Sequence, residues 1–292
     1  YAMAAASVDE ALRNAVCVGV DLDLIAGLDN FCWPDPVESA KTPDGRYKLA
    51  QLVRANRAID DTCRAYRLPC ISGKDSMKND ATLNGEKISV PPTILFSLVG
   101  NHSDVRKAVS SDFKNEGDSI YILGETHQEL GASELAFMLR EDGEGGIGES
   151  VPGIDTSRNL AMYRALTHAM SDSLVASAHD CSDGGLAVAL AECCFGSDSG
   201  ASIELNPLLS DPQALDKWGA LFGESLGRII VSVKQENREA FESAMRGNAC
   251  HYIGTVEEGD EISFSIRGEK VLVASMNDLR TTWKHALDGG GI

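Results

Sequence analysis

The apolar residues recur along the chain at both helical and strand-like spacings, which predicts a mixed α/β protein. Residues 3–18 are rich in alanine and carry apolar side chains at helical intervals, and Gly19 follows where a helix would end. A helix is therefore expected to open the chain. Residues 24–28 form a short apolar run that predicts a strand, and Pro34 and Pro36 predict a shaped loop in place of a regular element after it.

The next part of the chain contains a second helical pattern followed by polar and extended segments. Residues 49–66 predict a helix, residues 72–84 a polar loop, and residues 87–100 an extended segment that two prolines interrupt. Residues 101–116 are polar, and a new strand is predicted at residues 118–124. We place a domain boundary within the polar stretch, which gives an N-terminal domain over residues 1–105 and a C-terminal α/β domain over residues 106–292.

The second domain alternates helical and strand-like patterns. Ser275 and Asp278 form a capping pair before the last helix. Residues 141–153 are rich in glycine and acidic residues, which predicts a surface loop and not a phosphate cradle. The predicted helices are 133–139, 155–170, 186–195, 235–245 and 276–287, and the predicted strands are 202–205, 228–233, 252–256 and 262–266.

Composition excludes several classes of protein. The formal net charge of −18 disfavours nucleic acids and anionic membranes as partners, while 43% hydrophobic residues suffice for folded cores. No apolar run is long enough to span a membrane, and the first residues do not resemble a secretion signal. The eight cysteines form no Cys-x-x-Cys pair, so we interpret them as reduced core thiols of a cytoplasmic protein.

Three groups of residues can carry chemistry. Glu10 and Asn14 lie four residues apart on one face of the first helix, where both oxygens could bind one Mg²⁺, although the same spacing is typical of a solvated face. Residues 72–80 combine a glycine, two lysines, two acids and hydroxyl groups, which suits either an anion with its metal or a simple polar turn.

The third group, residues 179–185, joins a strand-like run to a helix. Gly184 and Gly185 allow backbone amides and the positive helix end to face a phosphate, while Asp180 or Asp183 offers oxygen to an accompanying Mg²⁺. Asp183 could also simply cap the helix. An acidic chain holds polyphosphate only through divalent cations, so the three groups together indicate a Mg-nucleotide.

Four segments carry a family resemblance: residues 9–14 (DEALRN), 28–34 (LDNFCWP), 72–78 (SGKDSMK) and 179–186 (HDCSDGGL). In order, and over nearly the whole chain, they resemble the second half of formylglycinamide ribonucleotide amidotransferase, also called phosphoribosylformylglycinamidine synthase. Weaker versions occur in aminoimidazole ribonucleotide synthetase, selenophosphate synthetase and thiamine-monophosphate kinase. The resemblance implies an aminoimidazole ribonucleotide synthetase-like fold, with an N-terminal domain that pairs in a β-barrel with its twin and is expected to be truncated at its start.

The resemblance also implies an activity and its partners. The complete synthetase is a ligase that uses ATP to phosphorylate the amide oxygen of formylglycinamide ribonucleotide, and ammonia from glutamine then displaces the phosphate in purine biosynthesis. The expected partners are the first half of the same synthetase, a glutaminase domain or subunit, and the small-molecule substrate. A fragment of this kind is expected to be inactive alone and could homodimerise.

Residue roles implied by the resemblance fall into two sets, neither of which includes a catalytic residue, because the family's catalytic histidine belongs to the first half. Lys74 replaces an asparagine of small family members, and since an ammonium cannot bind Mg²⁺, phosphate contact is the expected role there. The metal set, which would hold an auxiliary Mg-ADP or Mg-ATP, is Glu10, Asn14 and Asp180. The resemblance implies ATP- and substrate-binding roles for Asp29, Gly73, Lys74 and Ser76, and the chemistry of the two loops described above adds Asp75, Lys78, Gly184 and Gly185 to this set.

Three functional hypotheses follow from this resemblance. The chain could complete the active site of the amidotransferase, or it could be a non-catalytic module that a bound Mg-nucleotide stabilises. A stand-alone kinase or synthetase of the same superfamily ranks last, because it would need its own catalytic residues and a Gly-rich segment that is not visible.

Overall fold

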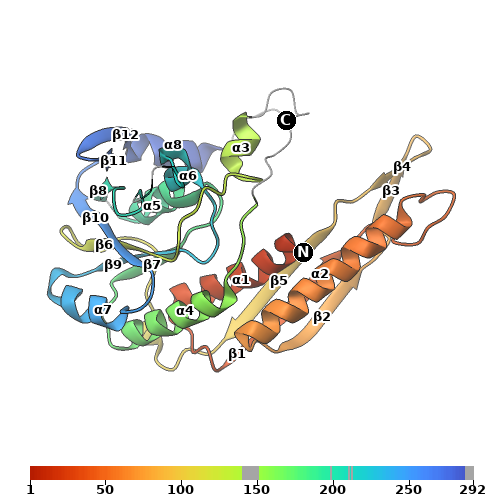
Figure 1. Ribbon diagram of the computed structural model, residues 1–292, viewed down its shortest axis with the longest axis horizontal. Helices are drawn as coiled ribbons and strands as arrows, with labels where there is room; N and C mark the ends of the chain where they lie inside the picture. Colours follow the sequence, from red (N-terminus) through yellow and green to blue (C-terminus); the bar gives the residue numbers. More distant parts are fainter. Residues whose placement is uncertain (140–150, 198, 210, 212, 287–292) are drawn as a thin grey trace.

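A small three-stranded sheet and two long helices form the N-terminal part of the chain (Figure 1). The computed structural model describes residues 1–139, 151–197, 199–209, 211 and 213–286. The sheet has the order β2 (Cys70–Ser76), β1 (Ile25–Cys32), β5 (Thr93–Gly100), with β1 parallel to β2 and antiparallel to β5. The helix α2 (Gly45–Tyr66) lies along one face of this sheet, and a hairpin of β3 (Asp80–Leu83) and β4 (Glu86–Ser89) extends beyond it. Every residue of β2 except Ser76 is exposed.

A seven-stranded sheet forms the rest of the described structure. Its order is β12-β11-β8-β10-β6-β9-β7, and its strand pairs are antiparallel except for β8 and β11. The strands are β6 (Ser119–Leu123), β7 (Ser177–Asp180), β8 (Ser199–Glu204), β9 (Ile229–Val233), β10 (Cys250–Glu258), β11 (Glu261–Ile266) and β12 (Glu269–Ser275).

Helices cover both faces of the large sheet, because side chains alternate along fully buried strands. The helices other than α2 are α1 (Ala2–Cys17), α3 (Glu134–Leu139), α4 (Thr156–Ser171), α5 (Gly185–Phe195), α6 (Lys217–Phe222), α7 (Arg238–Ala244) and α8 (Met276–His285), with short 3₁₀ turns at Val105–Lys107 and Gln235–Asn237. In β6, Tyr121 and Leu123 pack on one side, with α1, α4 and α7, whereas Ile120 and Ile122 pack on the other, with α5, α6 and α8.

A buried ionic network joins α1 to its neighbours. The carboxylate of Asp9 accepts hydrogen bonds from Arg13 at 2.5 Å and Tyr163 at 2.9 Å, and also from Tyr66 of α2 and Asn159 of α4. Asp9 and Arg13 are both buried, so each charge depends on the other. The network fixes α1 between the small sheet and the large one, and this helix carries the first predicted site residues.

Most predicted elements are present, but two expectations for the N-terminal part are wrong. The strand expected over residues 24–28 continues to Cys32 as β1, because β2 and β5 satisfy its backbone on both sides, and the prolines come only after its end. The polar loop expected over residues 72–84 contains most of β2 and all of β3. Both strands are largely exposed, so their polar composition does not prevent pairing.

Other expectations are met or stay open. Ser275 accepts the predicted capping bond from the amide of Asp278 at 3.2 Å, and α1 ends before Gly19 as expected. The domain boundary stays a prediction; it falls within the 3₁₀ turn Val105–Lys107. The loop expected over residues 141–153 lies mostly outside the described residues. Among the helices that the structure describes, none has the length and apolarity to cross a membrane.

Candidate functional site

A cavity of about 270 Å³ lies where α1 meets the turn between β7 and α5. Glu10 and Arg13 line it from α1, Asp183 lines it from the turn, and Glu224 lines it from the segment before β9. The fold therefore brings together two of the motifs that the sequence separates by about 170 residues. Glu224 was not predicted from the sequence; it belongs to no motif there.

Like charges face one another across this cavity. Partial burial, together with the charges of Asp180 and Asp183, raises the pKa of Glu10, although Arg13 opposes the shift. Burial also raises the pKa of Glu224, and the nearby charge of Asp183 contributes. A cation placed among these carboxylates would relieve their repulsion.

Arg13 adds a positive group to the same wall. Its side chain is 1% exposed, and its Nε has no hydrogen-bond partner among the described residues. A buried guanidinium donor without a partner is costly, and an anion in the cavity could satisfy it. The sequence contained a signal for this residue, since Asp9 and Arg13 form an i,i+4 charged pair on the apolar side of the first helix.

His179 and Asp180 form a second polar group at the end of β7. His179 Nε2 lies 2.9 Å from Glu192 Oε2, and its Nδ1 lies 3.6 Å from Asp180 Oδ1. Burial alone would lower the pKa of His179, but its hydrogen bonds to Asp180 and Glu192 outweigh burial and raise the pKa to about 9. Burial would raise the pKa of Asp180, but His179, Ser182 and Arg13 hold it below its usual range. Asp180 is thus a buried carboxylate whose neighbours favour its charged form, whereas Asp183 lines the cavity.

The two glycines at the start of α5 are required by the backbone. Gly184 and Gly185 have φ values of +78° and +67°, in the left-handed region that glycine tolerates best. Their amides already have partners, since Gly184 N–H donates to Glu224 at 2.9 Å and Gly185 N–H donates to the carbonyl of Ser182 at 3.0 Å. Gly184 itself occupies the N-cap position, with no side-chain cap, so Asp183 does not cap this helix. The expected role of both glycines at a phosphate stays a prediction.

The protein oxygen atoms at this cavity can bind Mg²⁺ only together with oxygen atoms of a bound ligand. Asn14 is exposed, and its amide nitrogen donates to the carbonyl of Glu10 at 3.1 Å, which leaves its side-chain oxygen available. Within the described part of the chain, no group of three or more His, Cys, Asp and Glu side chains is placed to hold a metal ion. Mg²⁺ commonly binds through one or two carboxylates together with phosphate oxygens and water, and Glu10 and Asp183 fit that pattern. Asn14 and Asp180 do not line the cavity, so their place in the metal set stays a prediction.

A second group of predicted residues lies on the small sheet. Asp29 of β1 is the register partner of Gly73 of β2, and the absence of a side chain at Gly73 leaves room for the Asp29 carboxylate. Lys74 and Ser76 contact each other through Nζ and Oγ. Because successive residues of a strand point to opposite faces, Lys74 and Ser76 lie on the face away from Asp29.

The last two predicted residues of this group lie apart from it. Asp75 is exposed on β2, and the ammonium of Lys78 lies 3.7 Å from Asp35 Oδ1, beyond the end of that strand. The structure therefore brings Asp29 to Gly73 and Lys74 to Ser76, but it does not gather all six residues at one point.

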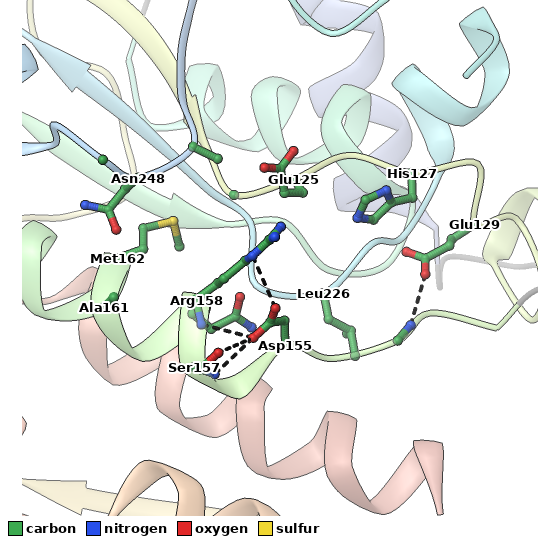
Figure 2. Close-up of a pocket in the computed structure, with 15 residues that line it drawn as sticks. Glu125, His127, Glu129, Asp155, Ser157, Arg158, Ala161, Met162, Leu226 and Asn248 are labelled. Carbon is green, nitrogen blue, oxygen red and sulfur yellow. Dashed lines mark hydrogen bonds and ion pairs between the residues drawn. The ribbon is translucent and has the colours of Figure 1, made fainter. Parts of the chain in front are cut away.

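A larger cavity of about 610 Å³ was not anticipated from the sequence. Figure 2 shows Arg158 extending from the start of α4, with Glu125, His127 and Glu129 on the opposite wall. Asp155 caps α4 by accepting from the amides of Ser157 and Arg158. Four separate segments contribute to this cavity, so no local motif marks it.

The two sheets and the helix α1 between them form an α/β fold of the aminoimidazole ribonucleotide (AIR) synthase-like class. Solved structures of other proteins have the same fold. Thermotoga maritima PurL complexed with FGAR superposes with a TM-score of 0.71 at 18% identity, over 95% of this chain and 42% of that chain. PurL complexed with ATP gives a TM-score of 0.68 at 18% identity, over 96% and 41%. The hydrogenase maturation protein HypE in complex with ATP gives 0.65 at 14% identity, over 93% and 78%.

The sequence match identifies the family. The family described as AIR synthase related protein, C-terminal domain, matches residues 115–267, which is more than half of the 292 residues. The chain belongs to this family. It spans less than half the length of the PurL chains that it matches, and the expected AIR synthase-like fold is confirmed.

Proposed function

We propose that this chain is the second half of an ATP-dependent synthetase that converts formylglycinamide ribonucleotide, ATP and glutamine-derived ammonia to the amidine in purine biosynthesis. The observation that carries the proposal is the cavity in which Glu10, buried Arg13 and Asp183 meet. Carboxylates and an unsatisfied guanidinium together suit a nucleotide whose phosphates carry Mg²⁺. The resemblance of the four motifs and the fold shared with PurL support the same assignment.

In this proposal each residue has a simple task. Arg13 binds phosphate oxygen through its free Nε, while Glu10, Asn14 and Asp180 or Asp183 hold Mg²⁺. Bound Mg²⁺ would neutralise the facing carboxylates and the nucleotide phosphates. Asp29, Gly73, Lys74 and Ser76 would reach the catalytic first half across a paired barrel, for which the exposed strand β2 offers an unpaired edge. In this proposal residues 1–105 form the barrel-pairing domain, and a glutaminase supplies the ammonia.

The first test measures binding by the chain itself. Mg-ADP at a hundredfold excess over its dissociation constant should stabilise the fold by about 2.7 kcal/mol. Glu10→Gln should abolish most of this gain, whereas the exposed control Glu86→Gln on β4 should retain it. Melting curves that do not respond to Mg-ADP in the wild-type chain would exclude the auxiliary site.

A second candidate function is a non-catalytic module that the nucleotide only stabilises. It is favoured because the cavity is lined by α1 and by the turn that leads into α5, and both helices belong to buried cores. Asp29→Ala and Ser76→Ala in the complete synthetase separate the two hypotheses. Loss of amidine formation with the auxiliary nucleotide still bound supports the active-site role, and unchanged turnover in both variants supports the module alone.

A further inference from the structure

Two cysteines touch where α2 passes into β2. The Sγ atoms of Cys63 and Cys70 lie 3.7 Å apart. The turn between them is tight, because Arg67 adopts a left-handed conformation with φ of 56° and the amide of Leu68 donates to the carbonyl of Cys63 at 2.9 Å. The two thiols are thus held in contact by backbone hydrogen bonding of the turn.

A β-bulge aims Cys70 at its partner. The register runs from Gly27 opposite Cys70 to Leu28 opposite Ser72, so Ile71 is an extra residue on β2. An extra residue reverses the alternation of faces, which turns Cys70 toward the side of the sheet that α2 covers. Without the bulge, the Cys70 side chain would point to the opposite face.

The two thiols differ in access. Cys70 is the exposed member of the eight cysteines, whereas Cys63 is buried and the other six are buried or half-buried. Burial and the neighbouring Cys70 sulfur raise the pKa of Cys63 well above its ordinary value. Cys70 is therefore the thiol that can meet a reagent first, and Cys63 is placed to react second.

A cavity leads to this pair. It measures about 640 Å³ and is lined by both cysteines, by Arg64 and Arg67, and by Asp29 and Asp60. Asp60 already pairs with Arg64 at 2.8 Å. Guanidinium groups attract carboxylates, and the volume is in the range of small-molecule sites. Oxidised glutathione, a small-molecule disulfide that carries both carboxylate and ammonium groups, matches the cavity in size and can pair with the guanidiniums and carboxylates of its wall.

We propose that Cys63 and Cys70 are a redox modification site that closes to a reversible disulfide by exchange with oxidised glutathione. In the first step the Cys70 thiolate attacks one sulfur of the glutathione disulfide, forms a mixed disulfide and releases one glutathione thiolate. In the second step Cys63 loses its proton to solvent and attacks the Cys70 sulfur, which releases the second glutathione thiolate. The two protein thiols lose two protons and two electrons, and one glutathione disulfide is reduced to two glutathione molecules.

The closed form would tie the C-terminal end of α2 to the first residue of β2, the strand that carries Gly73 and Ser76. The inference does not depend on the proposed synthetase function, because it rests only on the two thiols and their surroundings.

Peptide mapping tests the site directly. The purified chain is incubated with oxidised glutathione, its remaining thiols are alkylated, and it is cleaved with trypsin without reductant. Cleavage after Arg57, Arg64, Arg67 and Lys74 places Cys63 and Cys70 in separate peptides, residues 58–64 and 68–74. We expect these peptides to be joined, with the loss of two hydrogen atoms, and the count of alkylated thiols to fall by two from eight. Peptides that stay separate and unmodified would overturn the proposal.

Variants separate closure from unspecific oxidation. Cys63→Ser and Cys63→Ala should stop at a glutathione adduct on Cys70, Cys70→Ser should leave Cys63 unmodified, and the control Cys250→Ser should close like the wild type. Closure should accelerate about tenfold per pH unit near neutrality, because the thiolate fraction of Cys63 rises in that proportion. A stable wild-type adduct on Cys70 that does not close at raised pH, or a link from Cys70 to another cysteine, would refute the pairing.

Discussion

The carboxylate of Asp29 occupies the space that a side chain at Gly73 would need. A β-carbon built at position 73 would lie 2.6 Å from Asp29 Oδ1, closer than real contacts allow. Gly73→Ala should therefore displace the Asp29 side chain, which can rotate, and leave the backbone of β2 in place. In the synthetase that we propose this chain completes, we expect amidine formation to fall at least tenfold, while the free energy of unfolding changes by less than about 1 kcal/mol.

Gly153→Ala is a suitable control for this substitution, because among the described residues the one atom within 4 Å of its added carbon would be Glu129 Oε1 at 3.9 Å. This variant should retain full turnover. Equal turnover in Gly73→Ala and Gly153→Ala would show that the Asp29 carboxylate has no role in the reaction.

Asp9 stabilises the junction of α1, α2 and α4 as the partner of Arg13. Asp9→Asn preserves the shape of the side chain but leaves the buried guanidinium without a counter-charge. Breaking one side of a buried pair costs about 3–5 kcal/mol, and we expect a loss of this size in denaturant unfolding. The exposed pair of Asp60 and Arg64, at 2.8 Å, supplies the control: Asp60→Asn should hardly change stability, because solvent screens that interaction. A small loss in Asp9→Asn would mean that water reaches Arg13.

His179 should make stability fall as the pH rises from near neutral to alkaline values. Its pKa is about 9 in the folded chain against an ordinary value of 6.5, so the folded state holds the proton more tightly. The resulting stabilisation is complete below about pH 6.5 and is lost as the pH rises through 9. A difference of 2.5 pKa units corresponds to at most roughly 3 kcal/mol.

Urea unfolding at several pH values measures this effect. His179→Gln should flatten the decline between pH 6.5 and 9, whereas His168→Gln, at an exposed position of α4, should preserve it. If the wild-type chain keeps constant stability over this interval, His179 is not the imidazolium that its contacts with Asp180 and Glu192 indicate.

The helices and strands that could be predicted from the sequence are those with a strong periodic pattern of apolar residues. The buried strands β6 and β9 and the long helices α1, α2 and α4 have strong apolar patterns, so their positions could be predicted to within a few residues. The polar, largely exposed strand β2 has no such pattern and depends on pairing with a neighbour. The strand β12 was also not predicted; it is a short apolar run that pairs with β11 at the edge of the large sheet and leaves Val271 and Val273 exposed. The six-residue helix α6 was also missed, because a single turn and a half has little periodicity.

Part of the candidate site could also be predicted from the sequence, and part of it could not. The motifs around Glu10 and Asp183 could be found locally, because each combines ligand-type residues within a few positions. Their meeting, the contribution of Glu224 and the free Nε of Arg13 depend on how α1 packs against the large sheet. The fit of Asp29 to Gly73 likewise follows from the register that the bulge at Ile71 sets, which no spacing in the sequence reveals.

Gly185 should tolerate alanine far less well than a glycine with similar backbone geometry in open space. Its φ is +67°, and an added β-carbon would lie 2.5 Å from the carbonyl oxygen of Gly223, a backbone atom that cannot move aside cheaply. Gly247 has φ of +89°, and no atom in the described part of the chain lies within 4 Å of the added carbon. Gly247→Ala should therefore lower the free energy of unfolding by about 1–2 kcal/mol, the cost of holding alanine in the left-handed conformation. Gly185→Ala should lower it further, by about 1–3 kcal/mol more, because the added carbon also overpacks the turn.

Chemical unfolding of the two variants isolates the steric contribution, because both share the left-handed strain. A stability loss in Gly185→Ala that clearly exceeds the loss in Gly247→Ala would confirm that the start of α5 packs tightly against the segment around Gly223. The same variant should also bind Mg-ADP more weakly, since displacing this turn moves Asp183 at the cavity wall. Equal losses in the two variants would instead mean that this turn yields easily and that its glycines are present for backbone conformation alone.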